Sequence, residues 1–147
     1  MSKKKTEKQK WLGKVRWVFN RYIRLRDAVR GLEGLCGKCI SCGATWLLMS
    51  PDDWKKYQAG HYWREDKYES VRFDERNVNG QCFRCNRYMS GNLAEYAEGL
   101  KKKIGARAFN ALNIKRNKVH SHTVVELERA YRIYKKLLEN KEAELGL

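Results

Sequence analysis

Apolar residues recur with helical spacing in the first part of the chain. Between residues 10 and 30 one face collects Trp11, Val15, Val18, Tyr22 and Leu25. This spacing is typical of a long amphipathic helix, and Gly31 favours its end. Residues 1–9 are mostly polar and basic, so we expect a disordered basic tail there and a helix over residues 10–30.

The pattern changes in the middle of the chain. Residues 59–63 alternate well enough to predict a strand, with residues 70–73 as its hairpin partner. Pro51, the only proline, predicts a turn or a helix start. We therefore expect a core over residues 36–92 that combines a hairpin with short helices and turns.

Helical patterns return after this core. Asn92 with Glu95, and Thr123 with Glu126, fit the capping box that starts a helix. They predict flanking helices within residues 93–145, including a short one near residues 106–112. The whole is expected to be an α+β fold with a single domain over residues 10–147.

Composition narrows the class of partner. The 147 residues include 32 Lys and Arg against 17 Asp and Glu, a net charge of +15. Such a field attracts polyanions, so nucleic acid is the first candidate. No apolar run approaches the about 20 residues that span a bilayer, and the N-terminal sequence lacks signal-peptide features. We expect a cytoplasmic protein without a membrane partner.

Five cysteines supply the first candidate chemistry. Two CxxC motifs are typical of a structural Zn²⁺ held by four thiolates, here Cys39, Cys42, Cys82 and Cys85. Cys36 also forms a CxxC with Cys39, but the glycine after Cys42 favours the Cys39 pair, which leaves Cys36 as a free thiol. The alternative is that the four thiols pack as small hydrophobic side chains.

Three polar residues around these motifs are candidates for catalysis. His61 lies in the predicted strand, Asn77 before the second CxxC and Asn86 directly after it. A histidine can accept a proton from water, and an asparagine oxygen can bind a hard cation. Together they resemble the signature of HNH, or ββα-metal, nucleases. Alternatively, Asn77 and Asn79 form turns and Asn86 caps a helix.

The motifs taken together resemble the NinG/Rap recombination proteins of lambdoid phages. The resemblance rests on four segments, residues 39–43, 59–62, 72–77 and 81–93, and it covers most of residues 20–140. It implies a zinc-stabilised ββα-metal core. It also implies a structure-specific endonuclease that uses Mg²⁺ or Mn²⁺ on branched DNA, such as D-loops and Holliday junctions.

The resemblance also assigns roles to residues. His61 would be the general base, Asn77 would orient the histidine loop, and Asn86 would bind the catalytic ion, as in the related resolvase endonuclease VII. Many HNH enzymes have an aspartate where this chain has Gly60, and Gln58 stands where an acidic residue would help. The missing carboxylate is expected among Asp53, Asp66, Asp74 and Glu75.

Basic residues near the core are the expected contacts to the DNA backbone. They are Arg64, Arg72, Arg76, Arg84 and Arg87. A homodimer would suit the pseudo-symmetric arms of a junction. Two other functions stay open: a zinc-stabilised nucleic-acid-binding module without catalysis, and a general HNH nicking nuclease.

Overall fold

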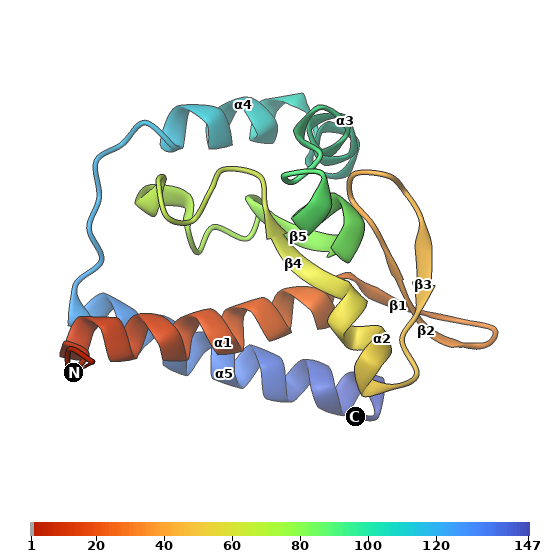
Figure 1. The fold of residues 1–147 in the computed structure, drawn as a ribbon, viewed down its shortest axis with the longest axis horizontal. Coiled ribbons are helices and arrows are strands. Elements are labelled where there is room, and N and C mark those ends of the chain that lie inside the picture. The colour runs from red at the N-terminus through yellow and green to blue at the C-terminus, as the bar shows by residue number, and fades with distance from the viewer. Residues whose placement is uncertain (1) are drawn as a thin grey trace.

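Two pairs of helices enclose a β-hairpin in the computed structural model, which describes residues 2–147. Figure 1 shows α1 (Glu7–Asp27) and α5 (Val124–Leu145) running side by side, with α3 (Leu93–Ile104) and α4 (Ala106–Lys115) on the opposite side of the molecule. The predicted α+β class, with a long N-terminal helix and C-terminal helices, is confirmed.

The first helix, α1, begins and ends earlier than predicted. The Thr6 hydroxyl accepts a hydrogen bond from the backbone N–H of Gln9 at 3.2 Å, and the Gln9 side chain accepts one from the Thr6 N–H at 2.9 Å. This capping box satisfies free N–H groups of the first turn. The predicted disordered tail is therefore wrong for residues 7–9, which are helical, and residues 28–30 belong to a strand.

The strands form two antiparallel sheets. The first sheet has the order β1 (Ala28–Gly31), β2 (Gly34–Lys38), β3 (Thr45–Leu47). The second pairs β4 (Tyr57–His61) with β5 (Val78–Cys82). In this hairpin, Tyr57 faces Cys82 at one end and His61 faces Val78 at the other. One CxxC motif therefore follows β2, and the other begins at the last residue of β5.

The partner of the strand that holds His61 differs from the prediction. Residues 70–73 lie in and after a 3₁₀ turn at Glu69–Val71, not in a strand. Val71 is fully buried there in a cluster with Tyr96 and Leu112, so its apolar side chain serves loop packing and not a ladder. A long ordered loop over residues 62–77 therefore joins the two strands.

Several helix boundaries agree with the sequence. A short helix, α2 (Pro51–Lys56), begins at the only proline, and α3 ends at Ile104 as expected. Asn92 adopts a left-handed φ of 45° and makes no capping bond, unlike the prediction. Within residues 2–147 every helix is too short or too polar to cross a membrane.

Two apolar clusters fix the hairpin between the helices. One contains Val18 of α1, Tyr57 of β4 and Leu138 of α5. The other contains Leu100 of α3 and Leu112 of α4. All five residues of β5 are buried between these layers. The hairpin is thus a rigid support for the groups at its two ends.

Candidate functional site

The cysteines of the two CxxC motifs converge on one point. They are Cys39, Cys42, Cys82 and Cys85, and their sulfur atoms all lie within 4.8 Å of one another. The first two follow β2, the third ends β5, and the fourth lies in a π-helical turn, Arg84–Tyr88. Cys36 stays on β2, where its Sγ lies 3.7 Å from the backbone oxygen of Gly34. The preference for Cys39 over Cys36 is confirmed.

Local backbone geometry shapes the first motif. Gly43 has a φ of 75°, which side chains disfavour, and its N–H donates to the backbone oxygen of Cys39 at 3.0 Å. The N–H of Cys39 donates to the oxygen of Ala44 at 2.9 Å. This tight turn brings the sulfurs of Cys39 and Cys42 to the same side.

Hydrogen-bond donors point at the sulfurs of the second motif. The backbone N–H of Cys85 lies 3.5 Å from Sγ of Cys82, and Nδ2 of Asn92 lies 3.4 Å from Sγ of Cys85. Such donors stabilise negative charge on sulfur. The same Nδ2 lies 2.9 Å from Oε2 of Glu95, so Asn92 links the cysteines to the first turn of α3.

The distances and burial of this group fit a zinc ion. With Zn–S bonds of about 2.3 Å, neighbouring sulfurs in a tetrahedron are about 3.8 Å apart. The sulfurs of Cys42 and Cys82 are 3.8 Å apart, and Cys39, Cys82 and Cys85 are each 1% exposed. Burial raises the pKa of Cys82 to about 12, and a bound cation would favour its thiolate form. We call this group the cysteine centre.

His61 is held in one orientation at the end of β4. Its side chain is 10% exposed, and its Nε2 lies 2.9 Å from the backbone oxygen of Arg72. Because a carbonyl oxygen only accepts hydrogen bonds, Nε2 carries the proton and Nδ1 keeps the lone pair of the neutral ring. Burial lowers the pKa of His61, although the carboxylate of Glu65 opposes this shift.

Glu65 is the acidic neighbour of His61 that the sequence did not identify. Its Oε2 lies 3.8 Å from Nε2 of His61, and its Oε1 lies 2.7 Å from Nη2 of Arg16. Among residues 2–147 no hydrogen-bond partner reaches the buried Oε2. The loop position of Glu65 gives no periodic signal, and its pairing with α1 appears only in three dimensions.

The carboxylates predicted for this place are engaged elsewhere. Each has contacts of its own: Asp53 with the backbone at the start of α2, Asp66 with Arg64, Asp74 with Arg76, and Glu75 with Arg26. In the described chain it is Glu65 whose carboxylate lies beside His61, with Oε2 3.8 Å from Nε2. The expectation that one of the four lies beside His61 is therefore replaced by Glu65.

Asn77 is fully buried and fastens the loop that follows His61. Its Oδ1 accepts from the N–H of Trp63 at 2.8 Å, and its Nδ2 donates to the backbone oxygens of Trp63 and Val71 at 3.0 and 3.1 Å. These bonds join the start of the loop to its 3₁₀ turn. Because Glu65 lies inside the segment so held, Asn77 shapes the surroundings of His61 without touching the ring.

Asn86 contacts Gln58 and not His61. Its Nδ2 donates to Oε1 of Gln58 at 2.7 Å. Gln58 and His61 are separated by an odd number of positions on β4, so their side chains point to opposite faces. Within residues 2–147 no hydrogen bond joins Asn86 to His61. The structure does not bring these two candidates into contact.

The potential ligand atoms around Asn86 do not fit a Mg²⁺ or Mn²⁺ site in their present arrangement. Such ions prefer carboxylate, phosphate and water oxygens. Asn86 and Gln58 offer neutral amides that already bond to each other, and the carboxylate of Glu65 is paired with Arg16. A divalent ion would need further oxygens from a ligand.

The five arginines predicted to contact DNA fall into two groups. Three are paired with acidic neighbours: Arg64 with Asp66, Arg72 with Glu69, and Arg76 with Asp74. Arg84 and Arg87 are exposed on the π-helical turn, and neither makes an ion pair within residues 2–147. The second group is the one available to a phosphate backbone.

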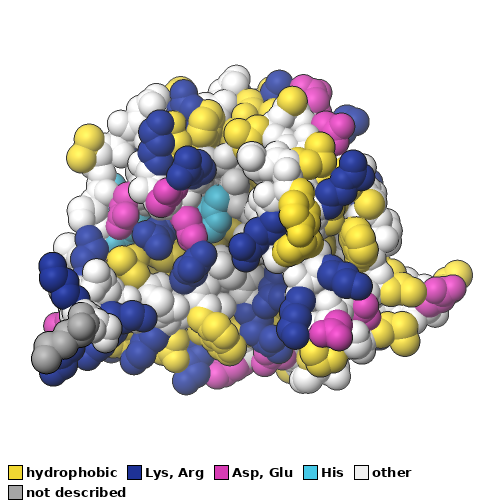
Figure 2. Space-filling model, in the orientation of Figure 1, with side chains coloured by type: hydrophobic (Ala, Val, Ile, Leu, Met, Phe, Trp, Pro, Cys, Tyr) yellow, Lys and Arg dark blue, Asp and Glu magenta, His cyan; other side chains and the backbone are white. Residues whose placement is uncertain are grey.

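The π-helical turn also exposes aromatic side chains. Phe83 and Tyr88 are 37% and 78% exposed, and their ring centroids lie 5.2 Å apart. Exposed aromatics beside arginines suit the stacking of unpaired bases. Figure 2 shows that Lys and Arg side chains are also spread widely over one face of the molecule. We call Phe83, Arg84, Arg87 and Tyr88 the basic-aromatic turn.

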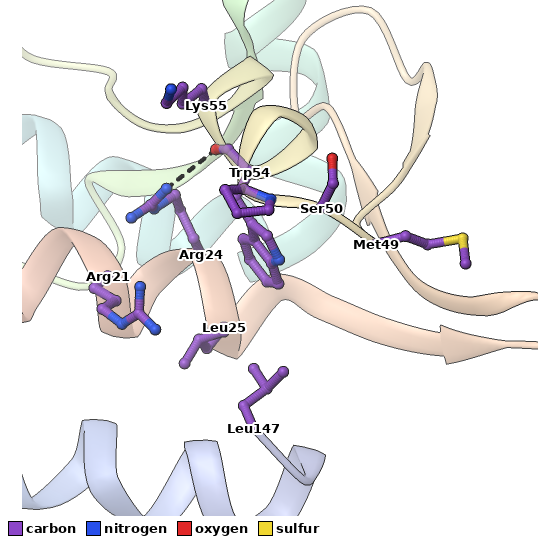
Figure 3. A pocket seen from close by; sticks show the side chains of 9 residues that line it. Arg21, Arg24, Leu25, Met49, Ser50, Trp54, Lys55 and Leu147 are labelled. Atoms are coloured by element: carbon purple, nitrogen blue, oxygen red, sulfur yellow. Dashed lines mark hydrogen bonds between the residues drawn. The ribbon is translucent and has the colours of Figure 1, made fainter.

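One cavity lies apart from these groups. It has a volume of about 400 Å³ and is lined by residues of α1, α2 and the C-terminus, including Arg24, Trp54 and Leu147 (Figure 3). Nη1 of Arg24 donates to the backbone oxygen of Trp54 at 3.1 Å, which fastens α2 to α1. None of the candidate catalytic residues lines this cavity, so it does not define the site.

Fold and site together define a strongly basic α+β protein with four clustered cysteines that could hold a metal ion and a buried histidine on the same hairpin. The family model described as bacteriophage lambda NinG protein matches residues 1–144. The chain belongs to this NinG family, as the sequence motifs predict.

Individual relatives agree with this assignment. The chain is 36% identical over 116 residues to protein ninG of Escherichia phage 933W, which covers 79% of the chain and 50% of the relative. It is 32% identical over 130 residues to protein ninG of Escherichia phage lambda, covering 88% and 56%. The chain spans about half the length of these curated relatives. No solved structure matches it.

Proposed function

We propose that the chain is an endonuclease that cuts branched DNA, with His61 as its general base. The observation that carries this proposal is the tautomer of His61. Its Nε2 is tied to the Arg72 oxygen at 2.9 Å, which leaves Nδ1 as the basic nitrogen. A pKa lowered by burial keeps the ring neutral near pH 7, so that it can accept a proton.

Each neighbour of His61 has a part in this reaction. Nδ1 would take a proton from the water that attacks a DNA phosphate, while one P–O ester bond breaks and the departing sugar oxygen takes up a proton from solvent. The positive ring that results would be stabilised by Glu65, whose Oε2 lies 3.8 Å from Nε2. Asn77 would hold the loop that carries Glu65 in place. These roles are positioning and electrostatic, and only His61 moves a proton.

DNA would bind through charge and stacking. The net charge of +15 attracts the backbone, and the basic-aromatic turn offers two unpaired arginines and two exposed rings. Phosphate contacts and stacking carry little base sequence information. They support recognition of branch shape and unpaired bases, which is the preference that the NinG/Rap resemblance implies.

The proposal includes Mg²⁺ or Mn²⁺ at Asn86. Nδ2 of Asn86 would keep its bond to Gln58 while Oδ1 faced the ion, and DNA phosphates would have to complete the ligand set. Assays of zinc-loaded protein with Mg²⁺, with Mn²⁺ or with neither ion test this part separately from the cysteine centre.

Nicking of labelled DNA tests the proposed activity. Wild-type protein is expected to cut a four-way junction and a D-loop faster than a linear duplex of the same sequence. His61→Ala should lower the cutting rate about 100-fold or more while junction affinity stays unchanged. Equal cutting of the linear duplex would instead indicate a general nicking nuclease.

We also propose a homodimer on the junction. Sedimentation with and without junction DNA tests this proposal.

A binding module without catalysis is the second candidate. It is favoured by one observation, that His61 and Asn86 contact different partners on opposite faces of β4. Tight junction binding by the wild-type protein, with no cutting in either divalent ion, would establish this function and refute the nuclease.

A further inference from the structure

A second cluster of side chains that can bind metal ions is distant in sequence from the cysteine centre. His120 and His122 lie in the connection between α4 and α5, and Glu126 lies in the first turn of α5. One ligand atom from each lies within 4.8 Å of the others. The Thr123 hydroxyl accepts from the N–H of Glu126 at 3.2 Å, which fixes this turn beside the histidines.

The three side chains are close enough to share an ion and open enough to receive one. Nε2 of His120 and Oε2 of Glu126 are 2.9 Å apart, a hydrogen bond whose proton would leave to solvent when an ion takes its place. The two imidazole centroids are 4.8 Å apart. The side chains of His120 and Glu126 are each 42% exposed, whereas that of His122 is 15% exposed. The group is thus anchored on one side and open to solvent on the other.

Glu69 stands behind His122 and selects its tautomer. Its Oε1 lies 3.0 Å from Nδ1 of His122, and an ionised carboxylate only accepts, so Nδ1 carries the proton. Nε2 therefore keeps the lone pair that a metal ion needs. A carboxylate behind a ligating histidine is the usual outer arrangement at zinc sites, where it fixes the orientation of the ring. The ring of Phe73, 5.5 Å from that of His122, restrains it further.

We propose that His120, His122 and Glu126 bind a divalent transition-metal ion such as Zn²⁺, with Glu69 as the positioning residue behind His122. Two imidazole nitrogens and one carboxylate oxygen are a known zinc donor set that leaves a fourth position open. Imidazole ligands also favour Zn²⁺ over Mg²⁺. The proposal of this metal site does not depend on the proposed nuclease activity, because its evidence is the positions of these four side chains.

The ion would restrain the loop that holds His61. Glu69 begins the 3₁₀ turn in this loop, and Arg72, which directly follows the turn, supplies the backbone oxygen bonded to His61. Arg72 also pairs with Glu69 at 3.8 Å. A metal ion that fixes His122 against Glu69 would therefore join the start of α5 to the support of His61.

Zinc counting tests the site on the full chain. The protein is equilibrated with micromolar free Zn²⁺, and unbound zinc is then removed. Elemental analysis is expected to find about two zinc ions per chain, one at the cysteine centre and one at the histidine group. His120→Ala and Glu126→Gln should each hold about one. His61→Ala is the matched control, because it removes the third histidine outside the group and should still hold about two.

Cobalt spectra keep the test independent of folding. Co²⁺ bound by thiolates absorbs in the near ultraviolet, so this band reports an intact cysteine centre in every variant. Saturating Co²⁺ should add visible absorption to the wild-type spectrum that the His120→Ala and Glu126→Gln spectra lack. About one zinc in the wild-type protein, or equal zinc counts in all four proteins, would overturn the proposal. The group would then be only two histidine–carboxylate pairs.

Discussion

The two ends of the β4–β5 hairpin are completed in different ways. At the end where Tyr57 faces Cys82, four sulfurs gather within 4.8 Å of one another, and burial raises the pKa of the Cys82 thiol to about 12. At the end where His61 faces Val78, groups of the chain itself hold the imidazole, through the Arg72 oxygen and the Glu65 carboxylate. The sulfurs at one end could be held together by an ion, whereas hydrogen bonds hold the other end.

This difference suggests that the two ends of the hairpin have different functions. The basic-aromatic turn is connected directly to the cysteine centre, because Cys85 lies within the turn Arg84–Tyr88. We therefore expect changes at this end to affect folding and DNA binding. Changes around His61 should affect cutting more than binding.

Replacing Cys82 by serine has the largest expected effect. The change leaves three sulfurs around an ion in a buried group, and metal binding contributes directly to folding in such sites. We expect a loss of about 5 kcal/mol and a fall in the thermal midpoint of about 10 °C or more, measured by circular dichroism. Cys36→Ser is the matched control and should change the midpoint little. Equal losses in both variants would remove the distinction between the two ends.

Replacing Asn77 by alanine should have the next largest effect. The loop groups of Trp63 and Val71 that Asn77 satisfies would lose their partners in a buried place, at a cost of about 2 to 3 kcal/mol. Urea denaturation measures this loss, and exposed Asn110→Ala is the control. Zinc content should stay unchanged. Loss of zinc in Asn77→Ala would show that the two ends are not independent.

The double variant Arg84→Ala with Arg87→Ala should weaken DNA binding. Loss of two phosphate contacts is expected to lower affinity about tenfold and to reduce the salt dependence of binding by about two ions. The cutting rate at saturating DNA should not change, because His61 lies at the other end of the hairpin. Arg107→Ala, an exposed arginine on α4, is the control. A slower cutting step with unchanged affinity would reverse the proposed division.

Replacing Glu65 by glutamine should have the smallest effect, on the pKa of His61. The carboxylate raises this pKa against burial, so its loss should shift the pKa further down from 6.5, as proton resonances of the ring would report in a pH titration. In the folded state the neutral ring is favoured. The contribution of this lowered pKa to folding stability is therefore fully present above the unfolded-state pKa of about 6.5. It is lost as the pH falls from there toward the lower pKa of the folded state. An upward shift in the variant would mean that Glu65 does not act on His61.

The cysteine centre and most helices could be predicted from the order of the amino acids alone. Two residues between cysteines place both sulfurs on one turn whatever the surrounding fold, so Cys39 and Cys42 could be paired from spacing alone. The start of α5 followed from Thr123, because a cap acts on its own next turn. Such signals are local, and the tertiary structure leaves them unchanged.

The partner of β4 and the surroundings of His61 could be recognised only in three dimensions. The sequence of β5 looks too polar for a buried strand, yet Asn79 and Gln81 are buried. Arg26, distant in sequence, donates to Oδ1 of Asn79, and Ser41, also distant, accepts from Nε2 of Gln81. Glu65 reaches His61 from a loop and is held there by Arg16 of α1. A buried polar group is stable only when its partners arrive, and no stretch of sequence shows which distant residues those partners are.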